Sequence, residues 1–305
     1  MITDIPTPAD FQSIGVQLLN SAWDTAASLL IDVDEADHYI DDTNELIDAF
    51  WNAARLQLST ALSIAQQGSE FLLKGRIASV SPFLLLAAVP REGPAGCAGT
   101  DKPFSDFRTI DAQDLIKVHN TCCSPRLPDS FVTEFEDLRK KRNSIMHSID
   151  KSLSIHVSDL VVAVLSINEA LGNEKNWVRT RRTYMNDAPQ SQMHSSDWVD
   201  PRLVLEFMSI RNLLKPAELK RFFAFDKNQQ NYICPNCAYS VDPDSEYKPL
   251  TALLKPNTPE STELWCFVCE ETNEVERKNC TEEDCKSNVL SHGQGRCLTC
   301  GTDVS

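Results

Sequence analysis

Eight cysteines after residue 230 constrain the fold of this chain more than any other feature. They form four pairs: Cys234 and Cys237, Cys266 and Cys269, Cys280 and Cys285, and Cys297 and Cys300. Three pairs have the C-x-x-C spacing, which can direct two thiolates at one tetrahedral zinc ion. Two such pairs complete a four-cysteine site. The spacing therefore predicts two structural zinc ions, the first bound by the first four cysteines and the second by the last four.

Two variations on this scheme stay open. The first pair could combine with the third, and His292 could replace one ligand of the second site. Four thiolates leave no open coordination position, so the zinc ions are not expected to be catalytic. The segment MITDIPTPAD lacks the basic and apolar regions of a signal peptide, so disulfides are not expected.

The zinc-binding tail has two possible uses. It could hold together residues that cannot build a core alone, or Trp265, Phe267 and Tyr232 could form a contact surface. The acidic tail favours protein over phosphate as the partner of such a surface. The other three cysteines are Cys97, Cys122 and Cys123. They are expected to be free thiols, although His119 and Cys122 have a metal-like spacing.

The charge of the chain is unevenly distributed. The 305 residues carry a net charge of −15. Residues 1–60 hold eleven acids and one base, and residues 226–305 hold fourteen acids and seven bases. The middle segment is nearly neutral and contains two basic clusters, at 139–142 and 179–182. These clusters indicate either a local basic site ringed by acidic surface or solvated helix faces.

The rest of the chain is expected to be mostly helical. Helical spacing of apolar residues predicts helices at 44–77, at 129–171 as one long helix or two stacked ones, at 201–214, and from Pro216 to about residue 223. Gly172 and Asn173 are expected to end the helix at 171. Residues 86–128 are expected to be loop-rich, and residues 185–199 are expected to form a polar connector. We predict a helical domain at 1–190, a connector with short helices at 191–229 and a tandem zinc-ribbon domain of β-hairpins at 230–305.

No apolar run approaches the roughly 18 residues of a membrane span. The chain is therefore expected to be cytoplasmic, with no membrane partner.

The segment RKKRNSIMH carries a candidate catalytic set. Arg142 can hold phosphate oxygens, Asn143 can orient by hydrogen bonding, and His147 titrates near neutral pH. Apolar residues recur at helical spacing along residues 129–171 and form a stripe on the predicted helix. Arg142 occupies a position of this stripe where an apolar residue is expected. Side chains five residues apart on a helix point about 140° from one another. Arg142 and His147 therefore need a local irregularity, or a second chain, to act together.

An arginine followed by a polar residue and, four positions later, a histidine resembles the motif of the HEPN superfamily of nucleotide- and RNA-binding domains. The resemblance covers about residues 40–175 and rests on Arg142, Asn143 and His147 in a helical bundle. It implies an all-α, HEPN-like domain with metal-independent endoribonuclease activity, whose cleft forms where two motifs meet in a homodimer. It also suggests a toxin or anti-phage effector.

Under this interpretation, His147 is a general base or acid and Arg142 stabilises negative charge on the phosphate. Asn143 orients the phosphate or the imidazole. Arg139, Lys140 and Lys141 contact the RNA backbone, and a protein trigger or inhibitor binds through the ribbons. The alternative is a structural role for Arg142 in an ion pair, for example with Glu136. The main rival function is a non-catalytic dimerisation module whose ribbons bind nucleic acid or protein as a regulator; a third is a subunit of a larger complex.

Overall fold

The computed structural model describes residues 1–39, 44–87, 100–147, 155–193, 195–241 and 248–304, without the side chains of 37–39, 44, 45, 146 and 147. The chain divides into two compact units. The first contains Met1–Ala26 and Asp42–Lys175, and the second contains Ala27–Asp41 and Asn176–Ser305. Residues 176–190, which the sequence assigned to the helical domain, therefore belong with the cysteine-rich tail.

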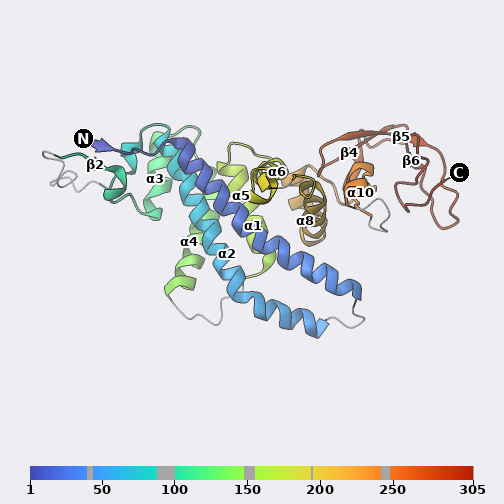
Figure 1. Ribbon diagram of the computed structural model, residues 1–305, viewed down its shortest axis with the longest axis horizontal. Helices are drawn as coiled ribbons and strands as arrows, with labels where there is room; N and C mark the ends of the chain where they lie inside the picture. The colour runs from blue at the N-terminus through green and yellow to red at the C-terminus, as the bar shows by residue number, and fades with distance from the viewer. Residues whose placement is uncertain (40–43, 88–99, 148–154, 194, 242–247, 305) are drawn as a thin grey trace. The chain divides into compact units, whose positions relative to one another are not determined.

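The first unit is a helical bundle around one long helix, α2 (Asn44–Ala78). It packs against α3 (Ala112–Cys122), α4 (Asp129–His147) and α5 (Val157–Leu171) (Figure 1). The apolar stripe predicted for α2 is buried from Ala54 onward, whereas Leu46 near the start of the helix is exposed. Fully buried side chains on these helices include Leu58, Leu62, Leu72, Phe135 and Leu160. Burial of such a stripe is the main source of helix stability in a bundle.

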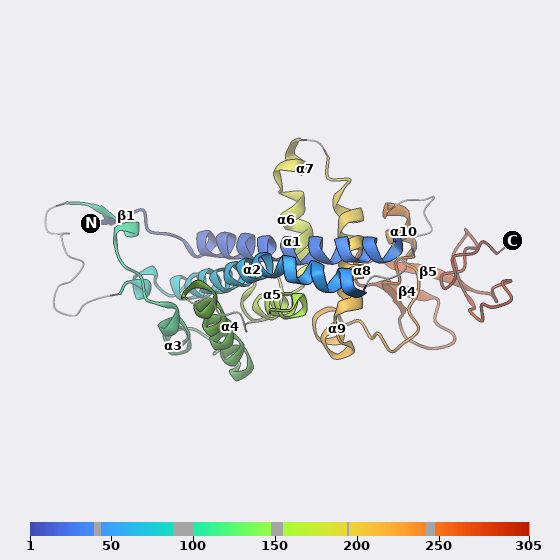
Figure 2. The same ribbon diagram turned by 90° about the horizontal axis from the view of Figure 1, so that it is seen from below.

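The beginning of α1 (Pro8–Tyr39) lies beside α2 in the first unit (Figures 1 and 2). Two glycines permit a close approach of the two backbones. A Cβ atom at Gly15 would lie 2.7 Å from the side chain of Leu72, and one at Gly68 would lie 3.1 Å from the carbonyl oxygen of Gly15. Larger residues at these positions would push the two helices apart.

The stretch from 129 to 171 forms two helices rather than one. α4 ends at His147 and α5 begins at Val157, and the two helices pack against each other. Gly172 ends α5, as its sequence position predicted, and its amide donates to the carbonyl of Asn168 at 2.8 Å.

The segment predicted to be loop-rich contains more structure than expected. It includes α3, a short parallel pairing of β1 (Ile2–Thr3) with β2 (Lys102–Pro103), and the 3-10 helix η2 (Phe104–Asp106). A second 3-10 helix, η1 (Pro82–Leu85), precedes it. Leu115 and Ile116 bury one face of α3 against the bundle.

The second unit joins helices to a small sheet. Its helices are α6 (Trp177–Asn186), α7 (Pro189–Met193), α8 (Val199–Leu213), α9 (Pro216–Phe223) and α10 (Pro235–Val241). Its strands are β3 (Ala252–Leu254), β4 (Glu263–Cys266), β5 (Thr272–Arg277) and β6 (Val289–Ser291). They form one antiparallel sheet in the order β3-β4-β5-β6, so the two cysteine modules share a sheet.

A buried ion pair attaches α6 to α8. Arg181 donates from Nε and Nη2 to the two carboxylate oxygens of Glu206, at 3.0 and 2.9 Å. Their side chains are 3% and 0% exposed, and Arg202 also donates to Glu206 at 3.0 Å. Such a bidentate pair fixes the position of α6 relative to α8. Loss of one partner would leave a buried charge uncompensated.

An aromatic cluster joins α8 and α9 to the first cysteine module. Phe267 lies 4.8 Å from Phe225, 5.5 Å from Phe223 and 6.2 Å from Phe207, measured between ring centroids. These separations suit edge and offset contacts. The helices before the tail therefore share its core, which explains why they form one unit with it.

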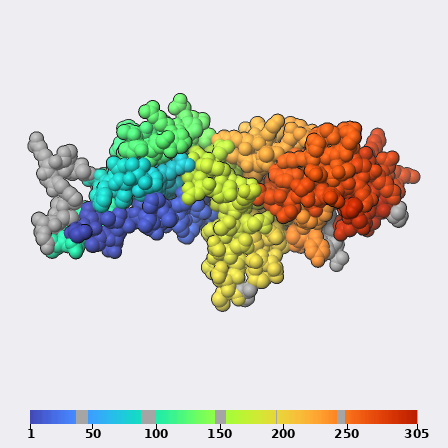
Figure 3. Space-filling model, turned by 90° about the horizontal axis from the view of Figure 1, so that it is seen from above, coloured from blue at the N-terminus to red at the C-terminus, as the bar shows by residue number. Residues whose placement is uncertain are grey.

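Membrane spans are absent from the described helices: none carries an apolar stretch long enough to cross a bilayer. Within the second unit, the orange and red residues of the described tail form one continuous mass in the space-filling view (Figure 3).

Candidate functional site

The first four-cysteine cluster brings two distant segments of the tail together. Cys234 directly precedes α10 and Cys237 lies in its first turn, whereas Cys266 ends β4 and Cys269 lies in the following turn. The sulfur atoms of Cys234 and Cys269 are 3.6 Å apart, as are those of Cys237 and Cys266. The four sulfur atoms all lie within 4.8 Å of one another.

The second cluster has the same form. Cys280 and Cys285 lie between β5 and β6, and Cys297 and Cys300 follow β6. The sulfur atoms of Cys280 and Cys300 are 3.6 Å apart, and those of Cys285 and Cys297 are 3.8 Å apart. These thiols are less buried than those of the first cluster, although Cys297 is fully buried.

The sulfur separations fit a tetrahedral metal ion. With metal–sulfur bonds of about 2.3 Å, a regular tetrahedron places its ligands about 3.8 Å apart. The distances of 3.6 to 3.8 Å match this spacing in both clusters and exceed a disulfide bond by far. The chain therefore contains two groups compatible with structural metal binding.

The grouping of the cysteines confirms the sequential pairing. The first two pairs meet in one cluster and the last two in the other, so the crossed arrangement does not occur. His292, the alternative ligand, is not a member of the second cluster. Its Nδ1 atom instead lies 3.4 Å from a carboxylate oxygen of Glu276.

Further contacts support the sulfur of Cys266. The hydroxyl of Thr251 lies 3.2 Å from it, and the amide of Val268 donates to it at 3.3 Å. Thr251 is fully buried. Donors around a thiolate hold the ligand in place and stabilise its charge.

The aromatic residues proposed as a contact surface are mostly internal. Phe267 is 2% exposed and Tyr232 is 8% exposed, so both belong to the core of the second unit. Trp265 is half-buried, and the ammonium of Lys255 lies 3.2 Å from the centroid of its indole ring. Of the three, only Trp265 presents part of its surface to solvent.

The Arg142 segment lies at the end of α4 in the first unit. Arg142 and Asn143 are half-buried, and Nη1 of Arg142 donates to Oδ1 of Asn143 at 3.1 Å. Phe135 and Leu138 on the same stripe are buried, so the arginine continues a face that packs on the bundle. The side chain of His147 lies outside the described residues, and its role stays a prediction.

The three basic residues before Arg142 contact carboxylates. Arg139 donates from Nε and Nη2 to Glu136, at 3.0 and 2.8 Å. Lys140 lies 3.7 Å from Asp137, and Lys141 lies 3.9 Å from Asp159 on α5. Such pairs at a surface are weak, so they reduce the local positive charge without removing it. It is Arg139, not Arg142, that pairs with Glu136.

Glu70 on α2 is an acidic neighbour of this segment that the sequence analysis missed. Burial raises the pKa of Glu70, and the charges of Lys74, Arg142 and Arg139 and a hydrogen bond from Gln66 oppose this rise. A carboxyl group within the packed stretch of α2 was the available signal, because such groups are seldom buried without a partner. The positive charge of Arg142 therefore favours the ionised form of the Glu70 carboxyl group on α2.

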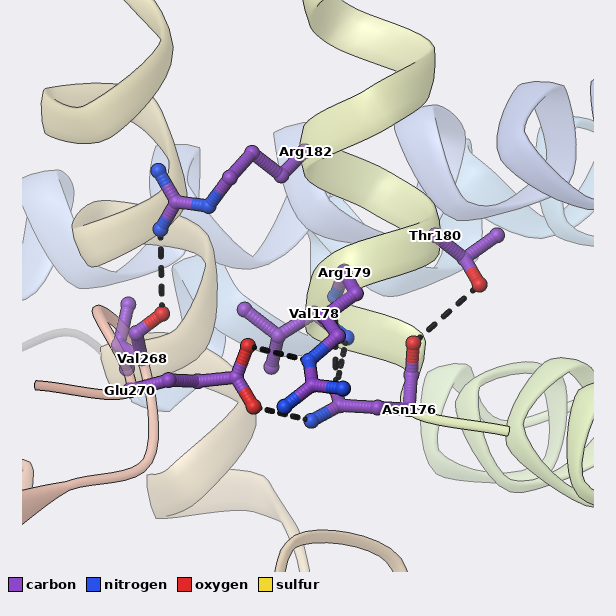
Figure 4. A network of polar contacts seen from close by, with 7 residues as sticks. All are labelled: Asn176, Val178, Arg179, Thr180, Arg182, Val268 and Glu270. Atoms are coloured by element: carbon purple, nitrogen blue, oxygen red, sulfur yellow. Dashed lines mark hydrogen bonds and ion pairs between the residues drawn. The ribbon is translucent and has the colours of Figure 1, made fainter. Parts of the chain in front are cut away.

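The second basic cluster is occupied by contacts within the second unit. Arg179 donates to Glu270 at 2.8 Å (Figure 4). Arg181 pairs with Glu206, and Arg182 pairs with Asp200. A charged residue whose charge is matched in this way is a weak candidate for phosphate binding. These arginines hold the unit together.

The remaining cysteines show no metal-like grouping. Among the described residues, the two four-cysteine clusters are the only groups with metal-site geometry, so His119 and Cys122 do not form one. Cys122 and Cys123 are free thiols, and burial raises the pKa of Cys123. Cys97 lies outside the described residues.

Comparison with protein-family models, with curated proteins and with solved structures gives no match to this chain.

Proposed function

We propose that this protein is a homodimeric, HEPN-like endoribonuclease that cleaves RNA without a catalytic metal ion. The observation that carries the proposal is the contact between Arg142 and Asn143 on α4, five and four residues before His147. The contact holds a guanidinium and an amide together on the helix. The predicted motif places an imidazole on the same helix.

The helix geometry favours a cleft made by two chains. Positions 142 and 147 both lie within α4, and positions five apart on a helix are about 140° apart around its axis. One copy of the helix therefore does not direct both groups at one phosphate. We propose that Arg142 of one chain acts with His147 of the partner subunit, which produces two equivalent clefts in a symmetric dimer.

The reaction uses the nucleophile that RNA carries. His147 removes the proton from a 2′-hydroxyl group, whose oxygen forms a bond to the adjacent phosphorus. The bond from phosphorus to the 5′-oxygen breaks, and this oxygen takes up a proton. Arg142 stabilises the charge that gathers on the phosphate oxygens, and Asn143 keeps the guanidinium oriented. The products are a 2′,3′-cyclic phosphate and a 5′-hydroxyl end.

The two cysteine clusters would hold zinc in this proposal. All-thiolate tetrahedral sites suit zinc and stabilise small domains without taking part in chemistry. The tail would then be a scaffold and a docking module for a protein trigger or inhibitor, and the protein would act in the cytoplasm as a toxin or anti-phage effector. Arg139, Lys140 and Lys141 would guide the RNA backbone by exchanging their carboxylate partners for phosphate.

The direct test is cleavage of a mixed RNA pool in the presence of EDTA. We expect cleavage to persist when free divalent ions are removed, and to stop on an RNA whose 2′-hydroxyl at the cleaved position is replaced by hydrogen. Product ends would be identified by mass spectrometry. Cleavage of DNA at a similar rate, or products with 5′-phosphate ends, would contradict the mechanism.

A wild-type protein that binds RNA in a shift assay and leaves it intact, with and without candidate triggers, would favour the non-catalytic regulator instead.

A further inference from the structure

The turn of the first cysteine cluster is fastened to the start of helix α6. The turn runs from Cys266 to Glu270, and Glu270 adopts a left-handed backbone conformation with φ of 62°. Its Oε1 accepts from the side-chain nitrogen Nδ2 of Asn176 at 2.7 Å, and its Oε2 accepts from Nε of Arg179 at 2.8 Å (Figure 4). Both carboxylate oxygens of Glu270 thus point at the beginning of α6.

Asn176 also caps α6. Its Oδ1 accepts from the backbone amides of Val178 and Arg179, at 2.8 and 3.4 Å. The amides of the first turn have no partners within the helix, so this contact is a stabilising N-cap. One side chain therefore joins two structures: its nitrogen holds Glu270 and its oxygen holds the helix.

A third contact strengthens the attachment one turn further along. Nη2 of Arg182 donates to the carbonyl oxygen of Val268 at 3.2 Å, and Nη1 of the same residue pairs with Asp200 on α8. The amide of Val268 in turn donates to the sulfur of Cys266. The turn that carries two metal ligands is thus bonded at Val268 and at Glu270 to three residues of the α6 region.

We propose that metal binding at the first cysteine cluster controls the order of the start of α6, through Glu270 and Asn176. The turn has its shape because Cys266 and Cys269 must meet the other pair of cysteines. Without the ion, four thiol groups lack the bonds that hold them together, and the turn loses its fixed position. Glu270 then no longer orients the Asn176 amide, and the cap on Val178 and Arg179 weakens.

The location of this cap gives the coupling a consequence. Asn176 directly follows Lys175, the last residue of the first unit. Metal occupancy would therefore set the conformation of the chain at the point where it passes from one unit to the other. This inference concerns the metal and α6 alone, and it holds whether or not the protein cleaves RNA.

The test is hydrogen exchange at the start of α6, measured by mass spectrometry on the full chain. In Glu270→Gln, which retains all eight cysteines, we expect exchange of the Val178 and Arg179 amides to accelerate about fivefold to tenfold, the factor expected for a weakened cap. Glu271→Gln is the matched control: this neighbouring glutamate is exposed, and exchange should equal that of the wild type.

Two further measurements distinguish this coupling from a general loss of stability in the second unit. A double variant, Cys280→Ser with Cys285→Ser, removes the second cluster and should leave exchange in α6 unchanged. Because coupling between two binding free energies is reciprocal, Asn176→Ala should weaken metal binding at the first cluster by a similar factor, measured at equilibrium against a coloured chelator. The proposal would be overturned if metal-loaded Glu270→Gln exchanged the Val178 and Arg179 amides at the wild-type rate. It would also be overturned if the second-cluster variant accelerated exchange at these amides as much as Glu270→Gln does.

Discussion

Replacing Arg142 or His147 with alanine is expected to lower RNA cleavage by about 100-fold or more. A general acid or base contributes about 10² to 10⁴ in rate, and a preorganised charge on the transition state contributes a similar factor. The loss should appear in kcat more than in KM, because both groups act most strongly in the transition state. Cleavage rates on a labelled RNA would measure it.

The controls address folding and local charge. Arg142 is half-buried and its charge favours the ionised form of Glu70, so the pKa of Glu70 should rise further when the guanidinium is removed. Circular dichroism and dimer mass should confirm that the first unit is intact. Lys140→Ala removes a largely exposed charge from the same helix and should change cleavage only a few-fold, mainly at low salt. Variants of Arg142 and His147 that cleave as the wild type does would exclude both residues from the site.

Replacing Cys237 with serine is expected to remove one of two metal ions and to unfold much of the tail. Structural zinc binding contributes about 10 to 16 kcal/mol in small zinc peptides, as much as the whole stability of a typical domain. Cys237 is fully buried beside Cys266, so no other group can replace its sulfur without rearrangement. Elemental analysis should show two metal ions in the wild type and one in the variant, with a clear fall in Tm.

Cys122→Ser provides the comparison, because Cys122 lies outside both clusters. That variant should retain two metal ions and the Tm of the wild type. A wild-type protein that binds iron instead would contradict the assignment of zinc, and unchanged metal content in Cys237→Ser would contradict the cluster itself.

The parts of the structure that the sequence predicted depend on short-range patterns. The close spacing within each of the four cysteine pairs led to the correct grouping of all eight cysteines, because each pair confines two ligands to one site. The periodic apolar residues located α2, and Pro216 marked the first residue of α9. The end of α5 at Gly172 followed from the same rules.

The parts that the sequence did not predict depend on partners far along the chain. Arg181 pairs with Glu206, and Arg179 is bound by Glu270, 91 residues away. No spacing rule identifies such pairs, so the cluster at 179–182 was predicted to be either a local basic site or a solvated helix face. Phe267 likewise looked like a surface residue beside a cysteine, whereas three phenylalanines from earlier segments enclose it.

The candidate catalytic segment was predicted only in part. Its position in a helical bundle follows from its pattern, and the charge interaction of Glu70 with Arg142 is a long-range feature that the pattern did not indicate. The proposed role of the second chain depends on the angle between positions 142 and 147 on α4.

The measurement that tests this central claim most directly is cleavage by purified mixed dimers. One dimer joins an Arg142→Ala chain to a His147→Ala chain, each carrying a different affinity tag. The other joins a wild-type chain to a chain with both substitutions. If Arg142 acts with His147 of the partner subunit, the first dimer retains one intact cleft and about half of the wild-type rate, and the second dimer is inactive. A first dimer without activity, together with a second dimer at half the wild-type rate, would place both groups in one chain and contradict the account.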